Sequence, residues 1–394
     1  MTNGWQTRNL GDLCEVVGGG TPPKDNPAYY SGKIPWATVR DMRHEVITET
    51  ECRITKDAVQ SSATNIIPSG NVIIATRVGL GKVCLLGQDT AINQDLRGII
   101  PRNSKTLTVR FLFWWLKSVA DVIVAEGTGA TVQGVKLPFV KSLPISVPPL
   151  PEQQRIVGIL DEAFAGIATA RANAEQNLQN ARALFESHLQ SVFKRQPNEV
   201  SLSALAADVT DGDHMPPPKA PAGVPFITIS NIVKRTRQID FSNTFTVPVA
   251  YFQNLKPNKK PRVGDVLYTV TGATLGIPVL VEEERDFCFQ RHIGLVRPKP
   301  DTHSAWLTYA LLSPQVFRQA TIGSTGAAQK TVSLSVLRDL KLPKLSFTEQ
   351  RRIAAELDAI SAETERLAVV CERKLTALEA LKKSLLHQAF TGQL

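Results

Sequence analysis

The sequence lacks several features that would place a protein in a membrane or outside the cell. It has no apolar run of membrane-spanning length, and its first residues, MTNGWQTRNLGDL, lack the basic-then-apolar order of a signal peptide. Its five cysteines are odd in number and scattered, which favours reduced thiols over a disulfide framework or a zinc site. We therefore expect a cytoplasmic protein without membrane contact. The cysteines are Cys14, Cys52, Cys84, Cys288 and Cys371.

The motifs of common enzyme active sites are also missing. The sequence contains no His-Glu-x-x-His, Cys-x-x-Cys pair or Gly-x-Ser-x-Gly element. GLGKV, from Gly79, lacks the spacing and the Ser/Thr of a phosphate-binding loop. The sequence therefore predicts no catalytic residue.

Two short stretches resemble functional motifs without completing them. Asn26-Pro27-Ala28-Tyr29 approaches the Asn-Pro-Pro-Tyr signature of adenine methyltransferases, but it lacks the second proline and a preceding glycine-rich strand–turn–helix. We interpret it as a turn. Asp211-Gly212-Asp213-His214 has no second cluster of ligands, which favours an Asx-type turn over a metal site. No metal-binding residue is predicted.

What the sequence does have is a basic surplus on an otherwise ordinary composition. Its 394 residues include 45 Lys and Arg against 36 Asp and Glu, a net charge of +9. This balance permits a nucleic-acid partner without requiring one. The length is enough for two or more domains with cores of their own.

The dominant feature is an internal repeat. EQQRI, from Glu152, recurs as EQRRI, from Glu349, which is 349 − 152 = 197 residues later and half of the 394-residue chain. Each half runs from a globular segment to a long helix, so this is a tandem duplication and not a solenoid. Further pairs follow in the same order: IPWATVRDM (from Ile34) and VPFITISNI (from Val224), SGNVIIATRVGLGKVCLL (from Ser69) and VGDVLYTVTGATLGIPVL (from Val263), INQDLRGIIP (from Ile92) and CFQRHIGLVRP (from Cys288), GTGATVQGVKLPFVKSLPI (from Gly127) and STGAAQKTVSLSVLRDLKL (from Ser324), LFESHLQSVF (from Leu184) and LKKSLLHQAF (from Leu381).

The globular segments have a mixed α/β pattern. NVIIAT, from Asn71, and DVLYTV, from Asp265, are typical of buried strands. RFLFWWLKSVADVIVA, from Arg110, and SAWLTYALLSPQVFRQA, from Ser304, have helical spacing. We expect the tryptophans of these helices to lie in the core; they are Trp114, Trp115 and Trp306.

Each half ends in a helix of roughly 42 residues, which at 1.5 Å per residue is about 60 Å long. Apolar residues repeat along each helix at three- and four-residue spacing, which predicts a seam between two antiparallel helices of a coiled coil. The alternative is that each helix packs only on its own domain. The fold class expected is α+β: two mixed α/β domains in a pseudo-two-fold tandem repeat, joined by two long antiparallel coiled-coil helices. The seam residues are Leu160, Phe164, Ile167, Leu178, Phe185, Ile353, Leu357, Ile360, Leu367, Leu378, Leu381 and Leu385.

Candidate DNA contacts are basic and polar residues of the loops, because phosphates are bound mainly by Lys and Arg while base edges are read by Arg, Lys, Asn, Gln, Ser and Thr. Solvation is the alternative role of such charges. The candidates are Lys24, Arg40, Arg43, Arg77, Lys82, Arg97, Lys136, His214, Lys234, Arg235, Arg237, Lys259, Lys260, Arg291 and Lys330.

Candidate partner-docking residues lie off the seam in the first turns of the two helices. They are Gln153, Arg155, Gln350 and Arg351. Ordinary packing and solvation of a helix N-terminus is the alternative interpretation.

Together these features resemble the specificity (S) subunit of a type I DNA restriction–modification system. The resemblance covers essentially the whole chain and rests on the joint order of four stretches. These are GGGTPPKDNPAYYSGKIPWATVRDM (from Gly18), PPLPEQQRI (from Pro148), TDGDHMPPPKAPAGVPFITISNI (from Thr210) and SLLHQAFTGQL (from Ser384).

The resemblance implies target recognition domains at 1–149 and 197–346, each binding one half of a bipartite DNA target, and conserved spacer helices at 150–196 and 347–394. It also implies double-stranded DNA, two methyltransferase (M) subunits and two restriction (R) subunits as partners. The cofactors are expected on those partners, S-adenosylmethionine on M and ATP with Mg on R, and none on this chain. The chain is then expected to be a non-catalytic protein of a bacterial or archaeal cytoplasm.

Two other classes stay open at this point. One is a coiled-coil scaffold without DNA readout, and the other is a stand-alone DNA methyltransferase or nuclease with an unrecognised active site.

The length of the helices is compatible with a bipartite DNA target. A helix of about 60 Å corresponds to roughly 18 base pairs at about 3.4 Å each, enough for two short half-sites and the gap between them. The two copies are not identical, since Pro-Pro-Leu-Pro precedes EQQRI whereas Leu-Ser-Phe-Thr precedes EQRRI.

Overall fold

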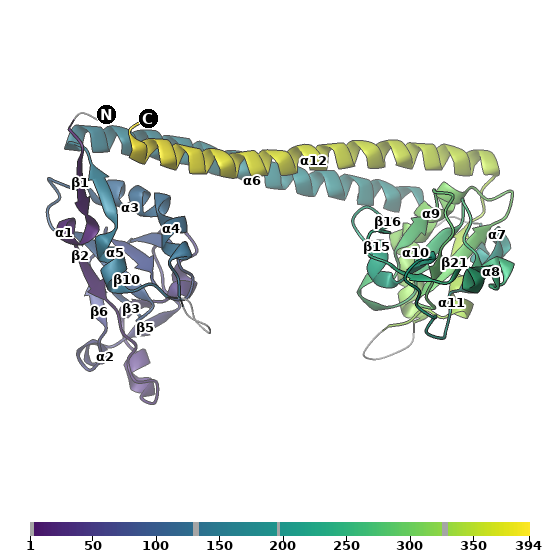
Figure 1. Ribbon diagram of the computed structural model, residues 1–394, viewed down its shortest axis with the longest axis horizontal. Coiled ribbons are helices and arrows are strands. Elements are labelled where there is room, and N and C mark those ends of the chain that lie inside the picture. The colour runs from purple at the N-terminus through teal and green to yellow at the C-terminus, as the bar shows by residue number, and fades with distance from the viewer. Residues whose placement is uncertain (1–3, 129–133, 195–197, 325–329) are drawn as a thin grey trace. The chain divides into compact units, whose positions relative to one another are not determined.

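The computed structural model describes residues 4–128, 134–194, 198–324 and 330–394. It consists of two compact units, one of Met1–Glu175 with Arg373–Leu394 and one of Gln176–Glu372. Each unit contains one globular domain and one part of each long helix (Figure 1). The repeats from Gly127 and Ser324 include residues 129–133 and 325–329, which lie outside the described residues.

Two long helices are shared between the units: α6 (Leu150–Val192) and α12 (Phe347–Thr391). Among the described residues, no helix is long and apolar enough to cross a membrane.

The domain of the first unit is built from short helices and strands in alternation. Its helices are α1 (Leu10–Leu13), α2 (Lys56–Gln60), α3 (Val109–Ser118), α4 (Ala120–Ala125) and α5 (Leu137–Ser142), with 3-10 turns η1 (Pro27–Tyr30) and η2 (Val39–Asp41). Its strands are β1 (Gln6–Asn9), β2 (Cys14–Gly18), β3 (Ile34–Ala37), β4 (Val46–Ile47), β5 (Cys52–Ile54), β6 (Asn65–Ile67), β7 (Val72–Ala75), β8 (Val83–Leu86), β9 (Thr90–Ile92), β10 (Leu96–Pro101) and β11 (Pro144–Val147).

The domain of the second unit follows the same plan. Its helices are α7 (Leu202–Leu205), α8 (Val249–Gln253), α9 (Ser304–Leu312), α10 (Pro314–Ile322) and α11 (Leu334–Asp339), with 3-10 turns η3 (Ile229–Asn231), η4 (Pro257–Lys259) and η5 (Gly272–Thr274). Its strands are β12 (Glu199–Ser201), β13 (Ala206–Asp211), β14 (Val224–Ile227), β15 (Ile232–Val233), β16 (Gln238–Ile239), β17 (Phe245–Val247), β18 (Val266–Thr269), β19 (Pro278–Leu280), β20 (Cys288–Phe289), β21 (Ile293–Pro298) and β22 (Lys341–Pro343).

The sheets repeat the duplication seen in the sequence. In the first domain one sheet has the order β2-β10-β7-β8-β4, and in the second the corresponding order is β13-β21-β18-β19. A second sheet places β3 between antiparallel β5 and parallel β9, and its counterpart places β14 between antiparallel β17 and parallel β20. The small pairs β1-β11 and β12-β22 also correspond. The predicted fold class is confirmed, because the two domains share one α/β topology.

The predicted strands and helices form where the apolar pattern placed them. The strand β7 lies within the predicted NVIIAT and is buried along its whole length, as is β18 within DVLYTV. The two predicted helices of the domains each divide, at Val119 into α3 and α4 and at Ser313 into α9 and α10, where Pro314 begins a new helix. All three expected tryptophans are core residues.

Both long helices contribute to each core. In the first unit, Phe164 of α6 packs against Trp114 of α3, with ring centroids 4.5 Å apart, and Phe390 of α12 packs against Phe111 at 5.2 Å. The core of the second unit likewise includes Leu189 of α6 together with Leu357 and other α12 residues. Each domain therefore packs on the first turns of the helix that follows it and on the last turns of the other helix.

Within each unit the two helix segments run antiparallel. In the first unit Arg155 donates to the carbonyl oxygen of Leu394 at 2.7 Å, and Arg171, further along α6, pairs with Glu379, which comes earlier in α12.

In the second unit the same order holds. Arg182 pairs with Glu372 at 3.4 Å, and His188, further along α6, lies 2.9 Å from Glu356.

The predicted seam is partly wrong. Leu367 and Leu381 are 40% and 47% exposed, so they do not line a helix contact. Ala174, which interrupts the predicted apolar pattern, is 1% exposed, and Thr364 is also buried. Small residues occupy the contact because they let two helix backbones approach, and a 3.6-residue helix drifts away from any fixed seven-residue pattern. Four predicted residues are buried, in contact with the domains: Leu160, Phe164, Ile353 and Leu357. Six are only partly buried: Ile167, Leu178, Phe185, Ile360, Leu378 and Leu385.

Enlarging the small residue at the helix contact of the first unit should destabilise it. Ala174→Leu is expected to cost about 1–3 kcal/mol, because Ala174 is 1% exposed and the added carbon atoms would have to displace the atoms that bury it. Ala172→Leu is the matched control, since Ala172 is exposed on the same helix and leucine is also a good helix former. Hydrogen exchange along residues 165–180 would measure both, and equal protection in the two variants would contradict the assigned contact.

Candidate functional site

In each domain, the loops that follow four strands meet at one edge of the sheets. In the first domain these loops follow β2, β3, β7 and β9, and we call them the first loop cluster: residues 19–24, η2, Arg77 and residues 93–95. In the second domain they follow β13, β14, β18 and β20, and form the second loop cluster: residues 212–214, η3, Thr271 and residues 290–292.

The two loop clusters are held by the same backbone hydrogen bonds. Gly20 N donates to Ile92 O at 3.0 Å, and Asp213 N donates to Phe289 O at 3.0 Å. These bonds establish which residue of one cluster corresponds to which residue of the other.

Two further pairs of bonds extend the correspondence. Asn93 N donates to Ala37 O, matching Gln290 N to Ile227 O, and all of these distances are 3.0 Å. The equivalence continues at the next strand, where Thr76 N donates to Asp95 O at 2.9 Å and Val270 N to His292 O at 3.0 Å.

A glycine is required at the same place in both clusters. A Cβ atom on Gly19 would lie 2.1 Å from Asn93 O, and one on Gly212 would lie 1.9 Å from Phe289 O. Only a residue without a side chain allows the backbones to come this close. The close approach brings the loop after the first strand of each sheet against the loop that carries Gln94 or Arg291.

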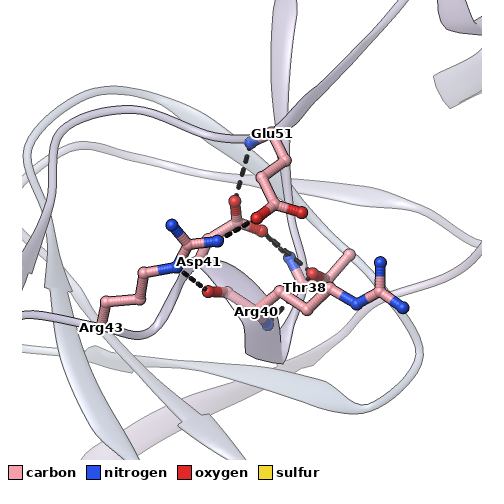
Figure 2. A network of polar contacts seen from close by, with 5 residues as sticks. All are labelled: Thr38, Arg40, Asp41, Arg43 and Glu51. Carbon is pink, nitrogen blue, oxygen red and sulfur yellow. Dashed lines mark hydrogen bonds and ion pairs between the residues drawn. The ribbon is translucent and has the colours of Figure 1, made fainter. Parts of the chain in front are cut away.

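The turn η2 of the first cluster is fixed by a network around Asp41 (Figure 2). Asp41 Oδ2 accepts from Thr38 N at 2.7 Å and from Thr38 Oγ1 at 3.0 Å, and Asp41 Oδ1 accepts from Glu51 N at 2.8 Å. Arg43 closes the network by donating to Arg40 O at 2.9 Å and pairing with Glu51. The backbone of Arg40 is therefore fixed, while its guanidinium points away from the network (Figure 2).

The second cluster builds the same turn with an amide. Asn231 Oδ1 accepts from Thr228 N and from Thr228 Oγ1, both at 2.9 Å, as Asp41 does from Thr38. Its Nδ2 donates to the carbonyl oxygens of Asp240 and Asn243. Ser230 holds the position that corresponds to Arg40.

The first loop cluster surrounds a surface pocket of ≈ 590 Å³. Two aromatic residues support its wall: Trp36 Nε1 donates to Gly20 O at 3.2 Å, and Tyr30 OH donates to Pro22 O at 2.7 Å. Their polar atoms are therefore engaged. The polar side chains that line the pocket include Thr21, Lys24, Thr38, Arg40, Asn93 and Gln94.

Most of the predicted basic residues of the first domain gather at this edge. Lys24 and Arg40 line the pocket, and Arg77 pairs with Asp95 at 3.5 Å. Arg97 donates to Gln94 O at 2.8 Å, and burial together with nearby Arg77 lowers the pKa of its guanidinium.

Three predicted basic residues of the first domain lie differently. Lys136 is exposed and follows Val135, whose N donates to Thr76 O at 2.9 Å. Lys82 is exposed beside the Gly79 turn. The Arg43 guanidinium is engaged with Arg40 O and Glu51, so it holds η2, and its contact with DNA stays a prediction.

The second cluster carries fewer free charges. His214 Nε2 lies 2.7 Å from Asp211 Oδ2, and Arg291 is exposed in the loop 290–292. Lys259 donates to Gly212 O at 3.0 Å and Lys260 to Gln253 O at 2.8 Å, so both support loops.

Two polar groups complete the second cluster. Lys330 is exposed beside Thr271, whose hydroxyl donates to its carbonyl oxygen at 3.4 Å. Tyr251 OH donates to Asp213 Oδ2 at 2.6 Å, and burial with this carboxylate raises the pKa of the phenol.

Three predicted contacts lie away from the second cluster. Lys234, Arg235 and Arg237 belong to the β15–β16 hairpin, which faces the long helices across a pocket of ≈ 740 Å³. Arg235 pairs with Glu372 at 3.0 Å and with Glu365 at 3.3 Å.

Arg237 completes this attachment of the hairpin. Its guanidinium lies 5.3 Å from the ring centroid of Phe185, and its backbone has a φ of 54°. Arg235 and Arg237, predicted as DNA contacts, are therefore engaged with the long helices of their own unit, and their contact with DNA stays a prediction. Lys234 is exposed.

The partner-docking prediction is wrong for the two glutamines. Gln153 is 0% and Gln350 is 1% exposed, so neither offers a surface. Gln153 Oε1 accepts from Thr108 N at 2.9 Å, and its Nε2 donates to Thr106 O at 2.8 Å and Pro148 O at 2.9 Å.

Gln350 makes the equivalent bonds in the second unit. It accepts from His303 N at 2.8 Å and donates to Leu345 O at 3.0 Å and Asp301 O at 3.5 Å. The repeated Glu-Gln motif is therefore a clamp between each long helix and the domain before it.

The other two docking candidates are exposed. Arg155 pairs with Glu152 at 2.7 Å and donates to Leu394 O. Arg351 remains on the surface of α12.

Sequence reasoning missed the second half of the clamp, an aspartate in each helix. Asp161 accepts from Trp114 Nε1 and Asp358 accepts from Tyr309 OH, both at 2.7 Å. Arg110 adds a two-pronged bond to Asp161. The signal was present, because 358 − 161 = 197 is the interval of the repeat.

Among the residues that the structure describes, no group of three or more His, Cys, Asp or Glu side chains has the geometry to hold a metal ion. Asp211 ends β13 and pairs with His214 of the loop that follows, and Asn26 caps η1 by accepting from Ala28 N at 3.2 Å.

Comparison with known proteins adds a family to this geometry. Residues 2–179 match the model of the type I restriction modification DNA specificity domain. The chain is 34% identical to the type I restriction enzyme EcoR124I/EcoR124II specificity subunit of Escherichia coli, over 40% of this chain and 40% of that protein. It is 28% identical to the type I restriction enzyme MjaIX specificity subunit of Methanocaldococcus jannaschii, over 40% of this chain and 37% of that protein. These matches thus span less than half of each relative's length.

The fold is shared with a solved structure. This structure concerns the complex assembly and conformational transition of the type I R-M system. One of its chains superposes on this chain with a TM-score of 0.79 at 22% identity, covering 100% of this chain and 99% of that one. This likeness shows the fold.

Proposed function

We propose that the chain is a specificity subunit of a type I restriction–modification system and acts as the DNA-reading subunit of such a complex, a proposal supported by the match of residues 2–179 to the DNA specificity domain and by the similarity to two specificity subunits. Each domain would read one half of a bipartite target in double-stranded DNA. Methylation and cleavage would be carried out by partner subunits and not by this chain.

One observation carries the proposal. The two domains present the same loop cluster on the same hydrogen-bonded scaffold, yet the exposed side chains of the clusters differ: Arg40 and Gln94 in the first, Ser230 and Arg291 in the second. A scaffold that is kept while its exposed polar groups change is suited to reading two different sequences. The basic residues around the first cluster would supply the phosphate contacts that position such readout.

The long helices suit a spacer and a docking surface. The clamps fix each domain on its helix, so a helix of defined length would set the gap between half-sites. Exposed apolar residues on the helices, among them Leu184, Val370 and Leu381, support the docking of protein partners there. We propose two M subunits as these partners, carrying S-adenosylmethionine, and two R subunits joined through the complex, carrying ATP and Mg.

Methylation mapping by single-molecule sequencing tests the proposal in a host that expresses the chain with its cognate M subunit. The expected result is a split motif with one modified adenine in each half, lost when this chain is omitted. Replacing residues 201–345 with those of another family member should then change one half only.

Two results would refute the proposal. A split motif that persists without this chain would remove its recognition role, and an active complex without any split motif would favour a scaffold without DNA readout. Methyl transfer or DNA cutting by the purified chain alone would instead establish an enzyme.

A further inference from the structure

We propose that Arg40 and Gln94 of the first domain, and Arg291 of the second, are base-reading side chains that determine the two half-sites. This inference rests on the proposed function, because it names the residues by which each domain would read DNA. It goes further in assigning a base to each residue: guanine to Arg40 and Arg291, and adenine to Gln94.

Gln94 and Arg291 occupy the same place in their domains, because they follow Asn93 and Gln290, which make equivalent backbone bonds. Both are exposed, each at the centre of a three-residue loop between two strands of its domain. A position that keeps its backbone and changes its side chain is where two different half-sites would be distinguished.

Arg40 combines a fixed backbone with a free guanidinium. Arg40 N donates to Thr38 Oγ1 at 3.2 Å, and Arg40 O accepts from Arg43, so the main chain of Arg40 is held on both sides. Within the described residues, the Arg40 guanidinium has no hydrogen-bond or ion-pair partner. The main chain of Arg40 therefore needs no further ordering when a ligand binds, and the donors of the guanidinium are available to that ligand.

The same reasoning holds for Gln94. Its loop is fixed by Asn93 and Asp95, which exchange hydrogen bonds at 3.0 and 3.1 Å. Thr21 donates to Gln94 Oε1, and this orients the amide. An amide oxygen has two lone pairs, so Oε1 can keep Thr21 and still accept a second bond, while Nε2 is left as a donor.

The base edges of DNA offer hydrogen-bonding groups that match these side chains. In the major groove, arginine makes a two-pronged bond to O6 and N7 of guanine, and glutamine makes one to N6 and N7 of adenine. Ser230, in the place of Arg40, is too short and too unselective to specify one base in this way. The first half-site should therefore contain a guanine and an adenine read by this pair, and the second half-site a guanine read by Arg291.

The test uses the full chain in complex with its M subunit and maps methylation for Arg40→Ala, Gln94→Ala and Arg291→Ala. Arg40→Ala should relax the specificity for one guanine, and Gln94→Ala should relax the specificity for one adenine of the same half-site. Arg291→Ala should relax the specificity for one guanine of the other half-site. Discrimination at the affected base should fall at least about fivefold, as expected for the loss of one two-pronged contact.

Two exposed residues provide matched controls. Arg102 follows the far end of β10 and Gln60 ends α2, and neither lines the pocket. Arg102→Ala and Gln60→Ala should leave both half-sites unchanged. If an alanine variant gives no methylation, Arg40→Lys, Gln94→Asn and Arg291→Lys repeat the test with the charge or the amide retained.

The outcomes separate this inference from the proposed function. A wild-type split motif that every assembled variant keeps unchanged would overturn the inference and leave the proposed function standing. A variant that still methylates, but equally more weakly at all sequences and with its base preferences unchanged, would also overturn it, because that is the signature of a phosphate contact. Absence of a split motif from the wild-type complex would overturn both.

Discussion

Arg297→Met lowers the free energy of unfolding of the second unit by about 3–5 kcal/mol, the largest loss expected from a single substitution considered for this chain. Its partner, Asp265, is 2% exposed and receives Arg297 Nε at 2.9 Å and Nη2 at 2.7 Å. Methionine fills much of the space but leaves the carboxylate charge buried without compensation, and that is the costly step.

The loss of stability in Arg297→Met should also affect the loop beside the second loop cluster. Arg297 Nη2 donates to Lys260 O at 2.8 Å, and Lys259 of the same loop donates to Gly212 O. The variant is therefore expected to loosen the basic loop around η4 as well as the sheet.

Hydrogen exchange of β18 and β21 would measure the change, because a chain of two units does not unfold in a single two-state step. Arg262→Met is the matched control, since Arg262 is exposed, and should change stability by less than about 0.5 kcal/mol. The double variant Arg297→Met with Asp265→Asn should recover part of the loss, because asparagine removes the charge and still accepts from Arg262 N. A cost below about 1 kcal/mol for Arg297→Met would contradict the assignment of a buried ion pair.

Breaking either glutamine clamp should cost about 2–4 kcal/mol, and each loss should stay in its own unit. Gln153→Ala leaves Thr108 N and two carbonyl oxygens without partners at a buried site, and Gln350→Ala does the same around His303 N. Buried backbone groups that lose their partners are expensive because no water replaces the bond.

Two amides report on the clamps directly. The amide of Thr108 should exchange faster in Gln153→Ala and that of His303 in Gln350→Ala, with no change in the other unit. Gln154→Ala and Arg351→Ala are matched controls, because these neighbours are exposed in the same helical turns. If a clamp variant matches its control in both stability and exchange, the glutamine does not join the helix to its domain.

The sequence determined the organisation of this protein through local and periodic signals. The apolar runs of β7 and β18, the helical spacing of α3 and α9, and the two long helices all follow from residues close together in the chain. The 197-residue interval predicted that two domains share one topology, because corresponding residues fold alike. Trp114 and Trp306 were expected in the core on the same grounds and lie there.

Only the tertiary structure decided which polar residues face solvent. Gln153 and Gln350 have the composition of a surface motif, yet they are buried, since the backbone groups that they satisfy come from loops about 45 residues away in sequence. In the sequence, Arg235 and Arg237 have the pattern of free basic residues. In the structure, Arg235 pairs with Glu372 and the guanidinium of Arg237 lies over the ring of Phe185, both on the long helices.

The same distinction applies to the candidate interface. The sequence by itself determined two similar domains, two long helices and a basic surplus, because these depend on composition and repeat. The tertiary structure alone decided that residues 19–24, η2 and 93–95 form one cluster, because their contacts join residues as far apart as Thr21 and Gln94, 73 positions along the chain, through hydrogen bonds that no local pattern encodes.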